Sequence, residues 1–108
     1  MRNLTRKEEL IMLSILHLKK DAYLISIADH LTEVTGKKVS LTSVHVPLSR
    51  LEKSGLIESR FGEATAVRGG RRKKVYTVTA LGFEVLDEHK KVTDMLWKSY
   101  LDASAPTD

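Results

Sequence analysis

Four stretches of the chain space their apolar residues as α-helices do, at intervals of three and four positions. The first, residues 5–18, opens with a Thr-x-x-Glu capping box and is apolar on nearly every side, which predicts burial on more than one side. It could pack as a simple core helix or also against a second subunit. The second stretch, residues 22–35, has Asp21 as its expected N-cap and Gly36 as its expected stop.

A third helix is expected over residues 41–54, with Ser40 as its N-cap and Gly55 after it. Its buried stripe is predicted to be Leu41, Val44, Leu48 and Leu51. Pro47 removes one helical hydrogen bond and is expected to kink or tighten the first turns. The opposite face holds small polar and basic residues, which is typical of a helix that packs behind and contacts DNA bases in front: Thr42, Val46, Ser49, Arg50 and Lys53, with His45 at the edge.

Two β-prone segments, residues 56–61 and 75–79, flank the stretch Arg-Gly-Gly-Arg-Arg-Lys-Lys (residues 68–74). A double glycine between such segments predicts a hairpin, and the tip would carry five cations. A solvated basic loop is the alternative interpretation. Two helices, a short link, a third helix and a hairpin predict a mainly α fold, a winged helix-turn-helix. A plain pair of antiparallel helices would account for the first part equally well.

A long fourth helix is expected after Thr79, its N-cap. The rest of the chain already forms a complete small domain and offers little surface to cover the apolar stripe of this helix. We therefore expect the helix to pair with a second subunit. Folding back onto the first helix of the same chain is the alternative. We therefore divide the chain into a DNA-binding domain (1–79), a dimerisation helix (80–103) and a disordered tail (104–108). The expected dimer interface comprises Leu10, Leu13, Val85, His89, Val92, Leu96, Trp97 and Tyr100.

Composition narrows the function classes. The chain has 108 residues, enough for one compact domain, and no cysteine, which excludes disulfides and thiolate metal sites. Its four histidines are scattered, so we expect neither a metal nor another cofactor. No serine has a base beside it in a convergent pattern, and no phosphate-binding glycine loop is present, so we expect no enzyme. The chain shows no secretory signal and no membrane span, so we expect a cytoplasmic protein.

Positive charge is concentrated in the middle of the chain. Between Lys37 and Tyr76 there are ten Lys or Arg residues and only three Glu. This pattern favours a polyanionic partner, and double-stranded DNA is the first candidate. A winged helix that binds RNA or the ribosome, and one that binds only other proteins, are the alternatives. We expect phosphate contacts from Lys38, Arg71, Arg72, Lys73 and Lys74, and base contacts among Thr42, Ser43, His45, Val46 and Ser49, with Arg50 and Arg71 undecided between the two roles.

The motifs Arg-Leu-Glu-Lys-Ser-Gly-Leu-Ile (50–57), Gly-Gly-Arg-Arg-Lys-Lys (69–74) and Thr-Ala-Leu-Gly (79–82) together resemble the PadR family of winged-helix transcriptional regulators. The resemblance spans residues 39–82 most closely and, with the first two helices, nearly the whole chain. It implies a homodimeric repressor of a palindromic operator. In such a protein the third helix would lie in the major groove, the wing at the adjacent minor groove or backbone, and the single C-terminal helix with the first helix at the dimer interface.

The chain departs from the family pattern at two positions. His45 stands where relatives usually carry a tyrosine near the DNA backbone, and Leu24 stands where they often carry a glycine. A histidine can still donate a hydrogen bond to a phosphate. Some PadR-like proteins bind planar aromatic ligands between their subunits with a tryptophan of the last helix. That resemblance makes Trp97 the candidate for such a ligand, with plain packing at the dimer interface as the alternative.

Overall fold

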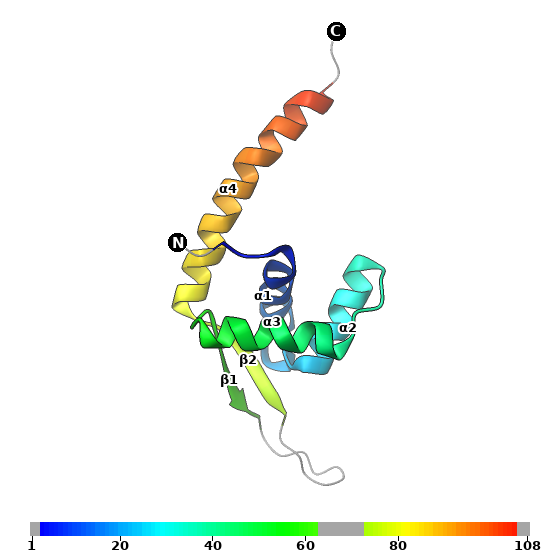
Figure 1. Cartoon of the computed structure of the whole chain (residues 1–108), viewed down its shortest axis with the longest axis vertical. Coiled ribbons are helices and arrows are strands. Elements are labelled where there is room, and N and C mark those ends of the chain that lie inside the picture. Colours follow the sequence, from blue (N-terminus) through cyan, green and yellow to red (C-terminus); the bar gives the residue numbers. More distant parts are fainter. Residues whose placement is uncertain (1–2, 63–72, 106–108) are drawn as a thin grey trace.

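The computed structural model describes residues 3–62 and 73–105. Three helices pack together beside a two-stranded hairpin, and a long last helix follows them. Figure 1 shows this last helix extending away from the rest. This arrangement confirms the predicted mainly α fold with a small hairpin. The elements are α1 (Arg6–Leu18), a short 3-10 helix η1 (Lys19–Asp21), α2 (Leu24–Thr35), α3 (Leu41–Lys53), β1 (Ile57–Phe61), β2 (Lys74–Val78) and α4 (Ala80–Ser104).

Helix α1 begins with the predicted capping box. The Glu8 amide donates to Thr5 Oγ1 at 3.1 Å, and the Thr5 amide donates to the Glu8 carboxylate at 2.9 Å. Only one side of the helix is fully covered by the chain itself, because Ile11, Met12 and Ile15 are buried while Leu13 is 47% exposed. Burial on more than one side is therefore not achieved within a single chain.

Helix α2 does not begin where the sequence predicted. Asp21 belongs to η1, and Tyr23 is the N-cap residue. Ser26 replaces the expected aspartate, since its hydroxyl accepts from the Tyr23 amide at 3.0 Å and donates to the Asp21 carbonyl. The predicted end is confirmed: Gly36 has φ +72°, a conformation that glycine adopts without the steric cost other residues meet.

Helix α3 has the predicted N-cap, with Ser40 Oγ accepting from the Ser43 amide at 3.2 Å. Val44, Leu48 and Leu51 are buried as expected. Leu41 is not: it is 46% exposed, because it lies in the first turn, beyond the part of α3 that the other helices cover. The helix continues through Pro47, which is itself buried on the core side.

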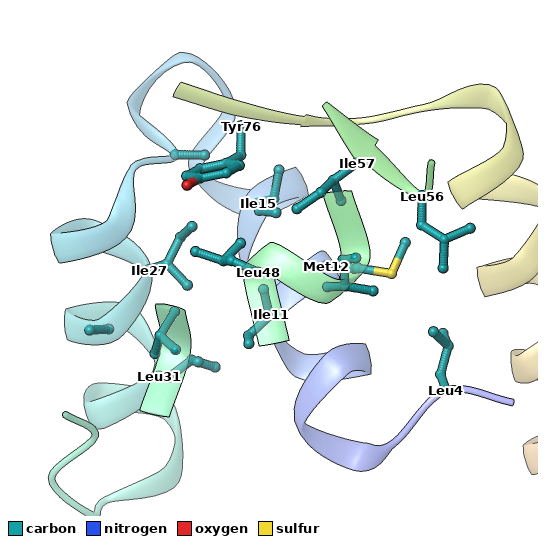
Figure 2. Close-up of a cluster of buried hydrophobic side chains, with 14 residues drawn as sticks. Leu4, Ile11, Met12, Ile15, Ile27, Leu31, Leu48, Leu56, Ile57 and Tyr76 are labelled. Atoms are coloured by element: carbon teal, nitrogen blue, oxygen red, sulfur yellow. The ribbon is translucent and has the colours of Figure 1, made fainter. Parts of the chain in front are cut away.

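The core joins all the elements up to β2. Figure 2 shows one cluster of apolar side chains from α1, α2, α3, both strands and the segment before β1. The hairpin is antiparallel, with Ile57 opposite Val78 and Phe61 opposite Lys74. The Tyr76 amide also donates to the Ala22 carbonyl at 2.8 Å, which ties β2 to the start of α2. The cluster comprises Leu4, Ile11, Met12, Ile15, Ala22, Ile27, Ala28, Leu31, Val44, Leu48, Leu51, Leu56, Ile57 and Tyr76.

Helix α4 starts at the predicted N-cap, where Thr79 Oγ1 accepts from the Gly82 amide at 3.0 Å. Val85 and Leu86 pack partly against the core, and His89 Nε2 lies 3.2 Å from a Glu9 carboxylate oxygen of α1. The alternative of folding back onto α1 therefore holds for the base of the helix only. The helix extends to Ser104, the first residue of the predicted tail. Within the described ranges, no helix is both long and apolar enough to cross a membrane.

Candidate nucleic-acid interface

The outer face of α3 presents the residues expected to contact bases. Thr42, His45, Val46 and Arg50 are exposed, and Ser43 and Ser49 are half-buried. The Ser43 hydroxyl already donates to the Ser40 carbonyl at 2.8 Å, so it contributes to the cap of α3. The freely accessible side chains of this face thus combine a hydroxyl, an imidazole, a methyl-bearing surface and a guanidinium, which can together read base edges.

A hollow of about 540 Å³ lies where the start of α2, the start of α3 and the start of β2 meet. We call it the basic hollow. The Lys73 ammonium lies 4.2 Å from the centre of the Tyr23 ring, close enough for a cation–π interaction. The hollow is lined by Tyr23, Leu24, Ile25, His45, Lys73, Lys74 and Tyr76.

The electrostatics of the basic hollow suit an anion. It contains two ammonium groups, and its imidazole and phenols can donate hydrogen bonds. Burial raises the pKa of the Tyr76 hydroxyl above its ordinary value; Lys74 opposes this shift and Glu52 adds to it. The Tyr76 phenol therefore keeps its proton near neutral pH and adds no negative charge to the hollow.

Glu52 joins the hairpin to α3. Its two carboxylate oxygens point to different strands: one accepts from the Ser59 hydroxyl of β1 at 2.5 Å, and the other lies 3.5 Å from the Lys74 ammonium of β2. Because Glu52 belongs to α3, these contacts fix the base of the hairpin relative to the outer face of that helix. An acidic residue, Glu52, thus links α3 to the hairpin within an otherwise basic surface.

Three of the five residues predicted to contact phosphates lie in the part of the chain that the structure describes. Lys38, Lys73 and Lys74 are exposed, as phosphate contacts must be, and His45 shares the basic hollow with the last two. Arg71 and Arg72 lie outside the described residues. Sequence reasoning missed Tyr23 and Glu52. Glu52 could have been noticed because it is an acidic residue between Arg50 and Lys53. No feature of the sequence around Tyr23 indicates its position in the hollow.

Of the predicted dimer residues, Leu13 is 47% exposed on α1, and the others fall into two groups. Val85, His89 and Leu10 contact or lie near their own chain's core and α1. Val92, Leu96, Trp97 and Tyr100 are exposed on the part of α4 that extends away from the domain. The Trp97 and Tyr100 rings meet edge to face, with centroids 5.2 Å apart. In the single chain, each side chain of this second group is at least 50% exposed.

A second hollow of about 460 Å³ opens between α1 and α4. Its apolar floor comes from both helices, and Trp97 stands at its far end. Acidic side chains line it more than basic ones, unlike the basic hollow. It is lined by Glu9, Leu13, Leu16, Phe83, Leu86, Asp87, Lys90, Thr93, Asp94 and Trp97.

In the part of the chain that the structure describes, one serine lies beside two histidines, but it is buried. Ser14 lies 2.8 Å from His30 Nδ1, and the His17 ring stacks on His30 at 4.4 Å, but Ser14 is only 2% exposed and cannot reach a substrate. Among residues 3–62 and 73–105, no group of three or more metal-binding side chains comes together.

Comparison with solved structures shows the same architecture across nearly whole chains. A PadR-like transcriptional regulator from Bacillus cereus strain ATCC 14579 superposes with a TM-score of 0.72 at 24% identity, covering 93% of this chain and 92% of that one. A PadR family regulator from Eggerthella lenta DSM 2243 gives 0.70 at 24% identity, with 94% and 87% covered. One from hypervirulent Clostridium difficile R20291 gives 0.65 at 26%, with 89% and 95% covered. Among curated protein sequences, none matches significantly.

The family comparison agrees with the geometry. The model of the Transcriptional regulator PadR-like family matches residues 12–88, which run from α1 through α2, α3 and the hairpin into α4. This match spans well over half of the chain and contains both the outer face of α3 and the basic hollow. The chain therefore belongs to the PadR-like family of transcriptional regulators.

Proposed function

We propose that this protein is a homodimeric repressor that binds a palindromic double-stranded DNA operator. One observation carries the proposal: His45 of α3 and the two lysines at the start of β2 line the same hollow, so the outer face of α3 adjoins cationic side chains of the hairpin. A duplex whose major groove receives α3 brings its phosphates to those cations.

The side chains divide the work of recognition. Thr42, His45 and Val46 face the bases from the first turns of α3 and Arg50 from its last turn, with the Val46 methyl groups suited to a thymine methyl. Lys73 and Lys74 neutralise phosphates, as do Lys38 before α3 and, beyond the described residues, Arg71 and Arg72. Affinity then falls steeply with salt, because each neutralised phosphate releases condensed counterions.

Helix α4 supplies the dimer contact in this proposal. Its outer half exposes an apolar surface formed by Val92, Leu96, Trp97 and Tyr100. Burying this surface against the same helix of a second copy is favoured by the hydrophobic effect. Two copies related by a twofold axis present two α3 helices, which matches a palindrome. Bound at a promoter, such a dimer represses by excluding the transcription machinery.

An aromatic ligand fits the same architecture. Trp97, 53% exposed, borders the hollow between α1 and α4, so a flat ring can stack on it there or between subunits. Quenching of Trp97 fluorescence by flat cationic dyes tests this part. An unchanged emission spectrum leaves Trp97 with a packing role only.

The decisive experiment selects duplexes from a random DNA pool and then measures affinity by electrophoretic shift. We expect a palindrome, and we expect Arg50→Ala to weaken binding to it about tenfold, the size of one lost base or phosphate contact. Arg6→Ala removes the same charge from the start of α1 and is expected to bind like the wild type. Equal affinity for structured RNA, or no enriched palindrome, contradicts the proposal.

A further inference from the structure

Phe61, the last residue of β1, is a large apolar side chain that is 65% exposed. The register of the hairpin pairs it with Lys74, and pairs Ser59 with Tyr76. Residues directly opposite each other in an antiparallel pair share one face of the sheet, as do alternate residues of one strand. Phe61 therefore lies on the same face as Ser59, Lys74 and Tyr76.

That face of the hairpin is turned toward α3. Ser59 and Lys74 both contact Glu52 of α3, and Tyr76 is buried in the core beneath α3. Phe61 continues the same face beyond the part that α3 covers. Its ring thus stands on the side of the hairpin where the proposed duplex lies, and no described side chain shields it from solvent over most of its surface.

The surroundings of Phe61 determine what can cover it. Lys74 of β2 is directly opposite it, Lys73 immediately precedes β2, and Arg60 is the preceding residue of β1, on the other face. The Gly62 amide donates to the Lys73 carbonyl at 2.8 Å, which holds the backbone next to Phe61 in the hairpin geometry. An apolar protein surface laid on this face would have to desolvate the Lys74 ammonium, which is costly. A DNA strand instead offers phosphates to the cations and apolar deoxyribose faces to the ring.

We propose that Phe61 packs against the deoxyribose backbone of the bound duplex, at the base of the wing. The proposal rests on the DNA-binding function proposed above. The contact excludes water from sugar carbons and phenyl carbons alike, and it neutralises no phosphate. It therefore adds affinity without adding to the salt dependence, in contrast to the contacts of its neighbours Lys73 and Lys74.

The test measures duplex affinity by fluorescence anisotropy at several salt concentrations, on the selected operator and on an unrelated duplex. Phe61→Ala is expected to bind both about tenfold more weakly, in the range of other aromatic contacts to nucleic acids, with an unchanged slope of log affinity against log salt. Phe61→Tyr keeps the ring and is expected within twofold of wild type. Lys74→Ala is expected to reduce the slope by about one.

Val75→Ala is the matched control. It truncates an apolar side chain that pairs with Arg60 on the other face of the hairpin, and its affinity is expected to match the wild type. Because Phe61 is largely exposed, the melting temperature of Phe61→Ala is also expected to be that of the wild type.

The outcomes separate the two proposals. If the wild type binds no duplex, the proposed function itself fails. If the wild type binds and Phe61→Ala stays within twofold of it, the Phe61 contact is refuted alone. A loss confined to the operator also refutes it, since that result assigns the ring to a base and not to the backbone.

Discussion

Gly82, in the first turn of α4, lies too close to the segment before β1 to carry a side chain. A Cβ at this position would be 2.1 Å from the Leu56 carbonyl oxygen and 2.7 Å from a methyl carbon of Val78. The Leu56 carbonyl also accepts from the Thr79 amide at 3.1 Å, the bond that precedes the turn into α4. We therefore predict that Gly82→Ala destabilises the fold, although alanine is the better helix former.

The magnitude follows from two opposing effects. Alanine gains about 1 kcal/mol of helix propensity over glycine. Against this, the backbone of α4 must move by about 1 Å, and such overpacking costs about 1–3 kcal/mol or more. Weakening the bond from Thr79 to Leu56 costs about 1 kcal/mol further. The net loss is about 1–3 kcal/mol, which lowers the melting temperature by about 5–20 °C in a domain of this size.

Thermal unfolding followed by circular dichroism measures this loss at one fixed protein concentration, since association shifts the melting temperature. Ser99→Ala is the control: it makes a smaller gain in helix propensity at an exposed site of α4 and is expected to melt at or slightly above the wild type. A Gly82→Ala protein that melts as high as the wild type would falsify the close approach between α4 and Leu56.

Three further predictions concern the interface and the dimer. Glu52→Ala removes both contacts between α3 and the hairpin base; we expect a loss of about 1–2 kcal/mol in urea unfolding, and a gain in stability contradicts it. The raised pKa of Tyr76 means that the folded state favours the neutral phenol, so this group's stabilisation is complete below the ordinary pKa of about 10 and is lost as pH rises through the folded value. Denaturation at pH 9 and pH 11 checks this, because Tyr76→Phe is expected to lose less stability between the two than the wild type. Leu96→Glu places a charge on the exposed apolar part of α4, and sedimentation is expected to show monomers; an intact dimer rules out that surface as the interface.

Much of the fold follows from local sequence chemistry. The caps at Thr5, Ser40 and Thr79 are confirmed, because each depends on a hydroxyl and an amide only three residues apart. The prediction that Asp21 caps α2 was wrong, because another side chain close in sequence makes the hydrogen bond at the start of that helix. A nearby serine, Ser26, offered an equivalent hydrogen bond, and sequence alone does not decide between two local caps that compete.

The sequence could not predict features that depend on how the helices and strands are placed relative to one another. Leu41 has the right spacing for the core stripe of α3, yet it lies in the first turn and stays 46% exposed. Tyr23 joins the basic hollow because β2 passes close to the start of α2, a contact between residues distant in the chain. The outer face of α3 was predictable, since it is simply the complement of the buried stripe.

Helix α4 is attached to the domain near its N-terminal end, so a change of angle there moves its C-terminal end. Its first turns contact the domain through Val85, Leu86 and the pair formed by His89 and Glu9, and the helix continues for about 22 Å beyond His89 to Ser104. A tilt of about 10° at that base displaces the far end by about 4 Å, roughly a tenth of the ~34 Å that separates successive turns of a duplex. In a dimer joined through α4, a small change in angle at the contact with α1 would therefore alter the separation of the two α3 helices.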